Sequence, residues 1–179
     1  QETALPPSSR VVRVGLETHM TRVVIRGGGE LKALTPEGAE IRRLEGKCDL
    51  VVVWRHGAGA IQDERKNVLM TFQDRIWIEP VEDADTIAVH AVSSGSGYFF
   101  AGESDRAYRG TLEIHPGPGK GFALIDRVPL ESYVAGVLPS EMPSHWPLEA
   151  LKAQAVAART DVISKMNRHR SEGFDVCDE

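Results

Sequence analysis

The sequence predicts an α+β protein, in which a β-rich region is followed by a short helix, a loop and a long helix. Short apolar runs, some of which alternate with polar residues, recur at a spacing of roughly 8–12 residues up to about residue 125. After Pro129 the apolar residues are instead three and four positions apart, which is typical of a helix face. We therefore expect an extended leader at 1–10, a β-rich region at 11–126 and a helical region at 127–179.

The β-rich region is expected to contain about ten short strands. Val12, Val14 and Leu16 alternate with other residue types, which is the period-two pattern of a half-buried strand. Two apolar runs on either side of the Pro-Glu-Gly sequence at 36–38 predict a hairpin. The spacing of the runs favours a sandwich or a barrel-like sheet. The expected strands lie near residues 12–16, 23–25, 31–34, 41–44, 50–54, 68–72, 76–78, 87–92, 98–101, 110–114 and 122–125.

Two helices are expected after Pro129. In the first, apolar side chains fall on one face, at Leu130, Tyr133, Val134, Val137 and Leu138. Pro139 should end this helix, because the residue before a proline disfavours helical geometry. A loop follows, and Pro147 should open a long second helix that reaches His169. One face of the second helix should be buried, comprising Leu148, Leu151, Ala155, Ala158, Val162 and Met166.

Length and charge limit the classes of function. With 179 residues the chain can form one large domain with a sizeable core, or two small ones. It has 21 Lys and Arg against 26 Asp and Glu, a net charge of −5. This balance argues against a nucleic acid as the main partner, because binding a phosphate backbone needs an excess of positive charge, but it leaves a neutral polymer such as a glycan open. No run approaches the ~18 apolar residues of a membrane span, so no membrane segment is predicted.

The cysteines and glycines carry no complete motif. Cys48 and Cys177 are compatible with one disulfide, two free thiols or an incomplete metal site. The glycine-rich stretch at 117–121 fails the phosphate-loop pattern, because Gly121 stands where a Ser or Thr is required. The sequence also lacks the HExxH zinc motif. We expect these glycines to form turns between strands.

Glu141 is the candidate for acid–base chemistry. It is expected in the loop between the two helices, beside Met142, Pro143 and Trp146. An apolar neighbourhood would raise the pKa of its carboxyl group toward that of a general acid, whereas the dipole of the following helix would favour the anion. Trp146 offers a flat face on which a sugar ring could stack. Judged on chemistry alone, a solvated surface glutamate is the simpler interpretation.

The stretch from about 108 to 177 resembles the SpoIID/LytB family of sporulation and cell-wall proteins. The resemblance rests on VPLESYVAGVLPSEM and WPLEALKAQAVAART, with YRGTLEIHPG and FALIDRVPLESY before them. It implies a lytic transglycosylase, a lyase that cleaves peptidoglycan glycan strands, with preference for strands stripped of peptide. Other members of the family are described as enhancers of cell-wall amidases, which provides an alternative, non-catalytic function.

The resemblance also implies roles for two residues. The glutamate of the SEM tripeptide, Glu141, is the catalytic residue, and the arginine of the AART segment, Arg159, belongs to the substrate site together with Trp146. One carboxyl group suffices for this reaction, which ends in 1,6-anhydromuramic acid and needs no cofactor. Arg159 would hold the lactyl group of the substrate or orient Glu141, unless it is an ordinary surface or helix-capping arginine. After AART this chain has Asp161 where the family usually has an aromatic residue.

His169 and Cys177 form a tentative, incomplete metal site. They stand eight residues apart after the long helix, and some family members bind zinc here with a His and two Cys. A structural zinc site needs four ligands, so we expect zinc only in a longer parent protein. An exposed histidine and a free thiol are the alternative.

The resemblance implies an exported protein of the cell envelope or periplasm. Its partner would be peptidoglycan glycan, with a cell-wall amidase in the enhancer alternative, and neither nucleic acid nor a membrane. A structural β-protein with a helical appendage is a third hypothesis. Because the family's catalytic core continues beyond the long helix, we expect the C-terminal part of the domain to be missing at Glu179 and the chain alone to be inactive.

Overall fold

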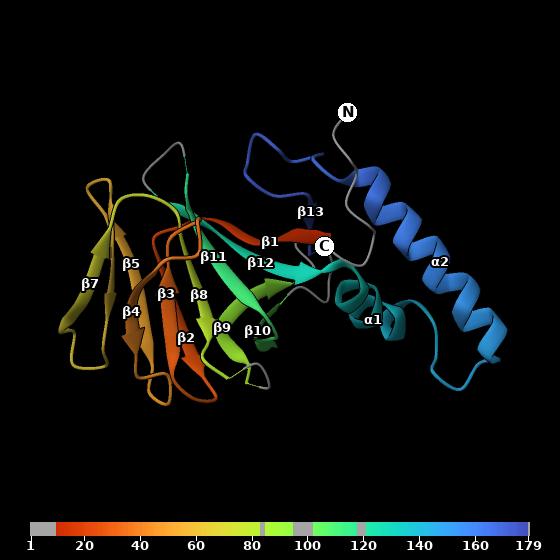
Figure 1. The fold of residues 1–179 in the computed structure, drawn as a ribbon, viewed down its shortest axis with the longest axis horizontal. Helices are drawn as coiled ribbons and strands as arrows, with labels where there is room; N and C mark the ends of the chain where they lie inside the picture. The colour runs from red at the N-terminus through yellow and green to blue at the C-terminus, as the bar shows by residue number, and fades with distance from the viewer. Residues whose placement is uncertain (1–9, 83–84, 95–101, 118–120, 179) are drawn as a thin grey trace.

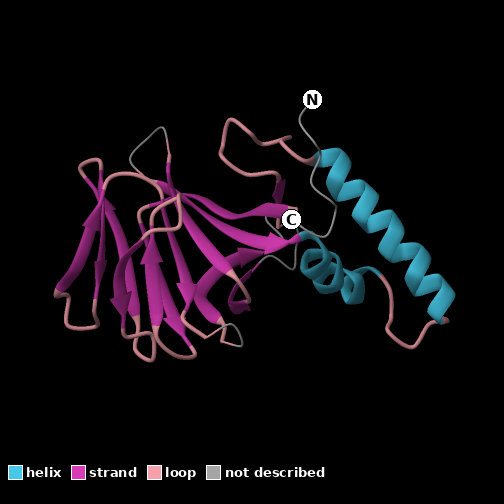
Figure 2. Ribbon diagram, viewed as in Figure 1, coloured by secondary structure: helices cyan, strands magenta, loops and turns pink. Residues whose placement is uncertain are grey.

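Two β-sheets face each other across one apolar core, and two helices lie at one end of them (Figures 1 and 2). The computed structural model describes residues 10–82, 85–94, 102–117 and 121–178. The predicted α+β class is confirmed. Of the expected leader at 1–10, only Arg10 lies within the described residues.

The first sheet has seven strands and contains both β1 and the strand that leads into the helices. All neighbours are antiparallel except β13, which pairs with β1 in parallel. Its order is β13 (Val176–Cys177), β1 (Val11–Met20), β12 (Phe122–Pro129), β11 (Thr111–Pro116), β8 (Ile76–Pro80), β3 (Leu31–Leu34) and β4 (Glu40–Leu44).

The second sheet has six antiparallel strands. Its order is β10 (Gly102–Tyr108), β9 (Ile87–Ser94), β2 (Arg22–Gly27), β5 (Leu50–Arg55), β6 (Ala58–Gln62) and β7 (Val68–Phe72). Alternating side chains of both sheets point into the shared core, where each buried large apolar side chain contributes roughly 1.5–3 kcal/mol. The largest fully buried ones include Ile25, Leu50 and Ile61 of this sheet and Ile78, Leu112, Phe122 and Leu124 of the first.

Most of the expected strands are confirmed, but three described strands are missing from the prediction: β6, β10 and the two-residue β13. β6 has the sequence AGAIQ, whose small residues have low strand propensity, and it forms because His56 and Gly57 adopt the positive φ angles of a tight hairpin turn after β5. β10 is a charged strand at the edge of the second sheet, a position at which charged side chains are common. The strand expected at 98–101 lies outside the described residues.

The first helix, α1 (Leu130–Glu141), is longer than predicted. It continues through Pro139, so the expectation that this proline ends the helix at Leu138 is wrong. Pro139 lacks the N–H that would bind the carbonyl of Ala135, and its ring crowds that carbonyl. Ala135 is exposed, so water can bind the displaced oxygen. The backbone N–H of Met142 still donates to the Leu138 carbonyl at 3.0 Å. Glu141 is therefore the last residue of the helix and not part of the loop.

The second helix, α2 (Leu148–Lys165), is shorter than predicted. It ends four residues before His169, because Met166 is extended and Asn167 adopts a positive φ of 66°. The expected buried face is confirmed at Val162, which is buried, and at Ala155, Ala158 and Met166, which pack against the core. It is wrong at Leu148, which is 64% exposed. Leu151, Ala155, Ala158 and Met166 are half-buried, because α2 packs mainly on the short α1. Neither described helix has the length and apolar character required to cross a membrane.

A buried carboxylate organises the outer face of the first sheet. Glu113 on β11 is fully buried and accepts hydrogen bonds from Arg13 on β1 at 2.6 Å and from Arg127 on β12 at 3.1 Å, while Arg75 lies 3.7 Å away. Burial alone raises the pKa of Glu113, but hydrogen bonds from His115 and Arg13 and the charge of Arg13 outweigh it and hold the pKa at about 2. Three neighbouring strands are thus tied together by one charge.

We predict that Glu113→Gln lowers the free energy of unfolding at pH 7 by about 3–5 kcal/mol, because it leaves the partly buried guanidinium groups of Arg13 and Arg127 without their counter-charge. The stabilisation is present above the ordinary pKa of 4.5 and is lost as the pH falls toward about 2, so the variant and the parent should converge over this range. Urea unfolding at several pH values measures this. Glu149→Gln, at an exposed position of α2, is the control and should change stability by less than about 0.5 kcal/mol. A pH-independent difference would contradict the assignment.

Candidate functional site

A groove of about 470 Å³ lies between α1 and α2, and we call it the Glu141 groove. Tyr133, Val137, Ser140 and Glu141 of α1 form one wall. The other wall belongs to α2, where the small side chains of Ala157 and Ala158 leave space for the groove. Val14 of β1 lies beneath. The lining comprises Val14, Tyr133, Val137, Ser140, Glu141, Gln154, Ala157, Ala158, Asp161, Val162, Cys177 and Asp178.

Glu141 lies at the mouth of this groove and is exposed. The apolar surroundings expected from its sequence neighbours are absent among the described residues, because Pro143 and Trp146 are themselves exposed and Met142 is half-buried. The carboxyl group can therefore reach a ligand in the groove directly from the end of α1.

Arg159 is not placed beside Glu141. Its guanidinium group binds the carboxylate of Glu131 through two hydrogen bonds, Nε to Oε1 at 2.8 Å and Nη2 to Oε2 at 2.6 Å. The hydrogen bonds that Arg159 donates lower the pKa of Glu131 and raise the pKa of Arg159. Glu131 is in the first turn of α1 and Glu141 in the last, so roughly 15 Å of helix separates them at ~1.5 Å per residue.

Trp146 lies in the connection between the helices and is 48% exposed. Its backbone N–H donates to the Pro143 carbonyl at 3.1 Å, which closes a turn just before α2. The indole thus has an accessible face near the end of α1, as an aromatic platform requires.

His169 and Cys177 come together, as the tentative metal site requires. The Sγ of Cys177 lies 3.4 Å from Nε2 of His169, whose ring stacks on Phe174 and whose Nδ1 lies 3.2 Å from Glu172. Within the described residues, no group of three or more His, Cys, Asp or Glu side chains is positioned to hold a metal ion. Two donors do not complete a structural zinc site. Neither Cys177 nor Cys48 forms a disulfide.

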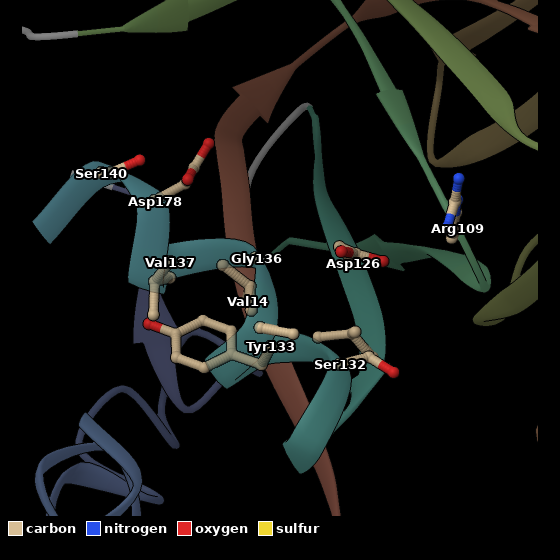
Figure 3. Close-up of a pocket in the computed structure, with 11 residues that line it drawn as sticks. Val14, Arg109, Asp126, Ser132, Tyr133, Gly136, Val137, Ser140 and Asp178 are labelled. Atoms are coloured by element: carbon tan, nitrogen blue, oxygen red, sulfur yellow. The ribbon is translucent and has the colours of Figure 1, made fainter. Parts of the chain in front are cut away.

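A second hollow, of about 580 Å³, adjoins the Glu141 groove, and we call it the Asp126 pocket (Figure 3). The two hollows share five lining residues, Val14, Tyr133, Val137, Ser140 and Asp178. Asp126 of β12 lines the second hollow at an inward-facing position of the strand, between the buried Leu124 and Val128. It was not among the candidate residues in the sequence.

Asp126 has an unusual environment for a carboxyl group. The residue is only 9% exposed, and its buried Oδ1 has no hydrogen-bond partner. Burial raises its pKa to about 7, and the charge of Asp178 adds to this effect. Burial also raises the pKa of Asp178, although Arg106, which forms an ion pair with it, opposes the rise. Asp126 therefore titrates near neutral pH, where an ordinary aspartate is ionised.

Comparison with known proteins finds relatives of the segment that contains Asp126, Glu141 and Arg159. Residues 118–179 match the model of the SpoIID family, described as "Stage II sporulation protein". The matched segment contains β12, both helices and β13. The resemblance to the SpoIID/LytB family is thereby confirmed, and it is carried by the C-terminal part of the chain.

Individual relatives support the same assignment. An uncharacterized protein of Brachyspira hyodysenteriae is 62% identical over 70 residues, covering 38% of this chain and 19% of its own. Stage II sporulation protein D of Bacillus subtilis is 55% identical over 42 residues, 24% of this chain and 12% of its own. A Bacillus subtilis protein named "Amidase enhancer" is 70% identical over 30 residues, 17% of this chain and 4% of its own.

The chain thus spans less than a fifth of the length of these relatives. No solved structure matches it.

We predict that Asp126→Asn stabilises the protein more at pH 8 than at pH 4. In the folded protein the carboxyl group keeps its proton up to about pH 7, whereas in the unfolded chain it has the ordinary pKa of 3.8. The folded state of the parent therefore loses stability as the pH rises from about 4 to about 7. At ~1.4 kcal/mol for each pH unit, the relative gain of the variant should reach several kcal/mol. Thermal unfolding at both pH values, with Asp74→Asn at an exposed position as control, measures it. An equal effect at pH 4 and pH 8 would show that Asp126 ionises normally.

Proposed function

We propose that this protein takes part in the lytic cleavage of peptidoglycan glycan strands, with strands stripped of peptide as the preferred substrate. The observation that carries the proposal is the position of Glu141 at the mouth of a groove, within the segment that matches the sporulation protein family. A groove open at the surface suits a polymer that enters from the side, and a single exposed carboxyl group suits a reaction that needs one acid–base residue. Such a protein acts in the cell envelope, where its substrate lies.

The proposed reaction uses Glu141 twice. Its carboxyl group donates a proton to the glycosidic oxygen as the bond from that oxygen to C1 breaks. The resulting carboxylate accepts the proton of the C6 hydroxyl of the same muramic acid, whose oxygen bonds to C1 and closes the 1,6-anhydro ring. No water is consumed, and Glu141 ends in its starting protonation state. The nucleophile belongs to the substrate, so proximity supplies part of the acceleration.

Arg159 and Trp146 are proposed as substrate-binding residues. Arg159 would bind the lactyl carboxylate in place of Glu131, a change of partner at an exposed ion pair. Trp146, beyond the end of α1, would stack on a sugar ring. His169 and Cys177 have no part in the proposed chemistry.

The alternative is a modifier that binds glycan and enhances a cell-wall amidase without cleaving the strand. The match to the Bacillus subtilis protein named "Amidase enhancer", 70% identical over 30 residues, favours this alternative. In this alternative the amidase is a direct partner.

We predict that Glu141→Gln lowers the rate of glycan cleavage by about 10²–10⁴-fold and leaves the fold unchanged, because the amide cannot transfer the proton. The measurement uses the longer parent protein, because the chain alone is expected to be inactive. Mass spectrometry of peptide-stripped glycan strands counts the anhydro-ended products over time. Glu149→Gln is the matched control at an exposed position of α2.

Cleavage by the Gln variant at the parent rate would remove Glu141 from the mechanism. Stimulation of an amidase by parent and variant alike, with no anhydro products from either, would establish the alternative.

We further predict that Arg159→Ala lowers kcat/KM for these strands by about tenfold or more, since a charge-assisted contact to the substrate is lost. Glu131→Ala removes the same ion pair but frees Arg159, so it should preserve or raise kcat/KM. Equal losses in both variants would mean that the ion pair only supports the packing of α1 on α2.

A further inference from the structure

The outer face of the second sheet is apolar where a face in water is normally polar. Antiparallel strands with one solvated face alternate apolar and polar residues, whereas continuous apolar runs are typical of strands covered on both faces. β5 has such a run: Leu50, Val52 and Trp54 point into the core, and Val51 and Val53 between them point outward. Outward side chains of neighbouring strands extend this surface. We call it the Val53 face, and its apolar members are Val24, Val51, Val53, Ala58, Ala60 and Ala88.

The Val53 face is continuous across four strands. Val24 of β2 lies opposite Val51 of β5, and Val53 lies opposite Ala60 of β6. Their neighbours in the sheet leave these side chains half-buried, with part of each surface facing outward. Both helices lie at the end of the molecule away from β5 and β7, so they do not cover this part of the face (Figure 1). The outer face of the first sheet differs, since it carries the charged cluster around Glu113.

The outward residues along β5 form a symmetric pattern of charge. Read along the chain they are an acid, two valines and a base: Asp49, just before the strand, then Val51, Val53 and Arg55. The two charged residues are about 20 Å apart at ~3.3 Å per residue. The pattern is therefore complementary to a copy of itself that runs in the opposite direction.

The two ends of β5 carry opposite charge. At one end Asp49 forms an ion pair with Arg26 at 2.7 Å, and Glu64 accepts a hydrogen bond from the backbone N–H of Asp49 at 3.0 Å. Two carboxylates there stand against one guanidinium group. At the other end Arg55 is exposed, and no carboxylate pairs with it in the part of the chain that the structure describes.

Symmetry decides how two such faces can meet. A two-fold axis that crosses β5 at Val52 places Val51 of one copy on Val53 of the other, and the acidic end of each copy on Arg55 of its partner. A two-fold axis along the strands would instead place Arg55 on Arg55, which like-charge repulsion disfavours.

We propose that the Val53 face is a homodimer interface, in which the second sheets of two copies pack face to face with their β5 strands antiparallel. Six strands about 4.8 Å apart and roughly 20 Å long give a footprint of about 500 Å² on each copy. The total is near the ~1,000 Å² that a specific interface needs, so the dimer is expected to dissociate reversibly. Neither Glu141 nor its groove belongs to this interface, so the proposal is independent of the proposed function.

The test is sedimentation equilibrium of this chain over a wide range of concentration, which should show a monomer–dimer equilibrium. Arg55→Asp should raise the dissociation constant of the dimer about tenfold or more, because it places like charges against Asp49 and Glu64 of the other copy. Val53→Glu should also raise it about tenfold or more, because it buries a carboxylate without a partner between the valines. Circular dichroism checks that each variant folds.

A charge reversal and a control complete the experiment. Arg55→Asp combined with Asp49→Arg restores the complementary pattern in the opposite sense, so this double variant should regain the dimer that Arg55→Asp alone loses. Arg42→Asp makes the same change of charge at an exposed position of β4 in the first sheet, and it should dimerise like the parent.

Three results would overturn the proposal. The chain could be monomeric at every concentration; a dimer could persist unchanged in both Arg55→Asp and Val53→Glu, which would place the contact on another surface; or a folded double variant could stay as monomeric as Arg55→Asp. If the double variant does not fold, the comparison of Val53→Glu with Arg42→Asp decides the question, since equal effects of these two substitutions would reject the Val53 face.

Discussion

The antiparallel pairing of β1 with β12 positions every part of the candidate site. It aligns Val11 with Pro129, at the point where β12 passes directly into α1, and the backbone N–H of Leu130 donates to the Arg10 carbonyl at 2.9 Å. On its other side β1 pairs with β13, so Val14 lies between Asp126 and Val176. The helix that carries Glu141, the strand that carries Asp126 and the segment that ends in Asp178 are thus held by one strand near the start of the chain.

The pKa of a buried carboxyl group is shifted in opposite directions on the two faces of this sheet. On the outer face, Glu113 is buried among guanidinium groups and keeps its charge far below ordinary pH. On the inner face, Asp126 is buried without a positive partner and takes up a proton near neutral pH. The number of donors within reach decides the difference, because desolvation acts against the charge in both places. A carboxylate with several donors stabilises the sheet, whereas a buried carboxyl group without them destabilises the fold when it ionises.

The last turn of α1 determines what the Glu141 groove exposes. Because the helix continues through Pro139, Tyr133, Val137, Ser140 and Glu141 fall along one side of it and face α2. Had the chain left the helix at Leu138, Ser140 and Glu141 would lie in a connecting loop with no fixed relation to Tyr133. The alanines of α2 complete the groove, since larger side chains at Ala157 and Ala158 would fill it.

The sequence alone predicted most of the elements in their order and the resemblance of the C-terminal segment to the SpoIID/LytB family. Period-two apolar runs predict most strands, since a strand with one buried face must alternate, and the glutamate motif predicts the family, which the comparison confirms. The sequence also contains a sign of Asp126, because this charged residue stands between Leu124 and Val128 in the alternating pattern of inward positions. The extent of α1, the exposure of Leu148 and the pairing of Arg159 with Glu131 were decided by the tertiary structure. The physical reason is that burial and ion pairing depend on which elements meet across the fold, whereas alternation and helical spacing are properties of the local chain.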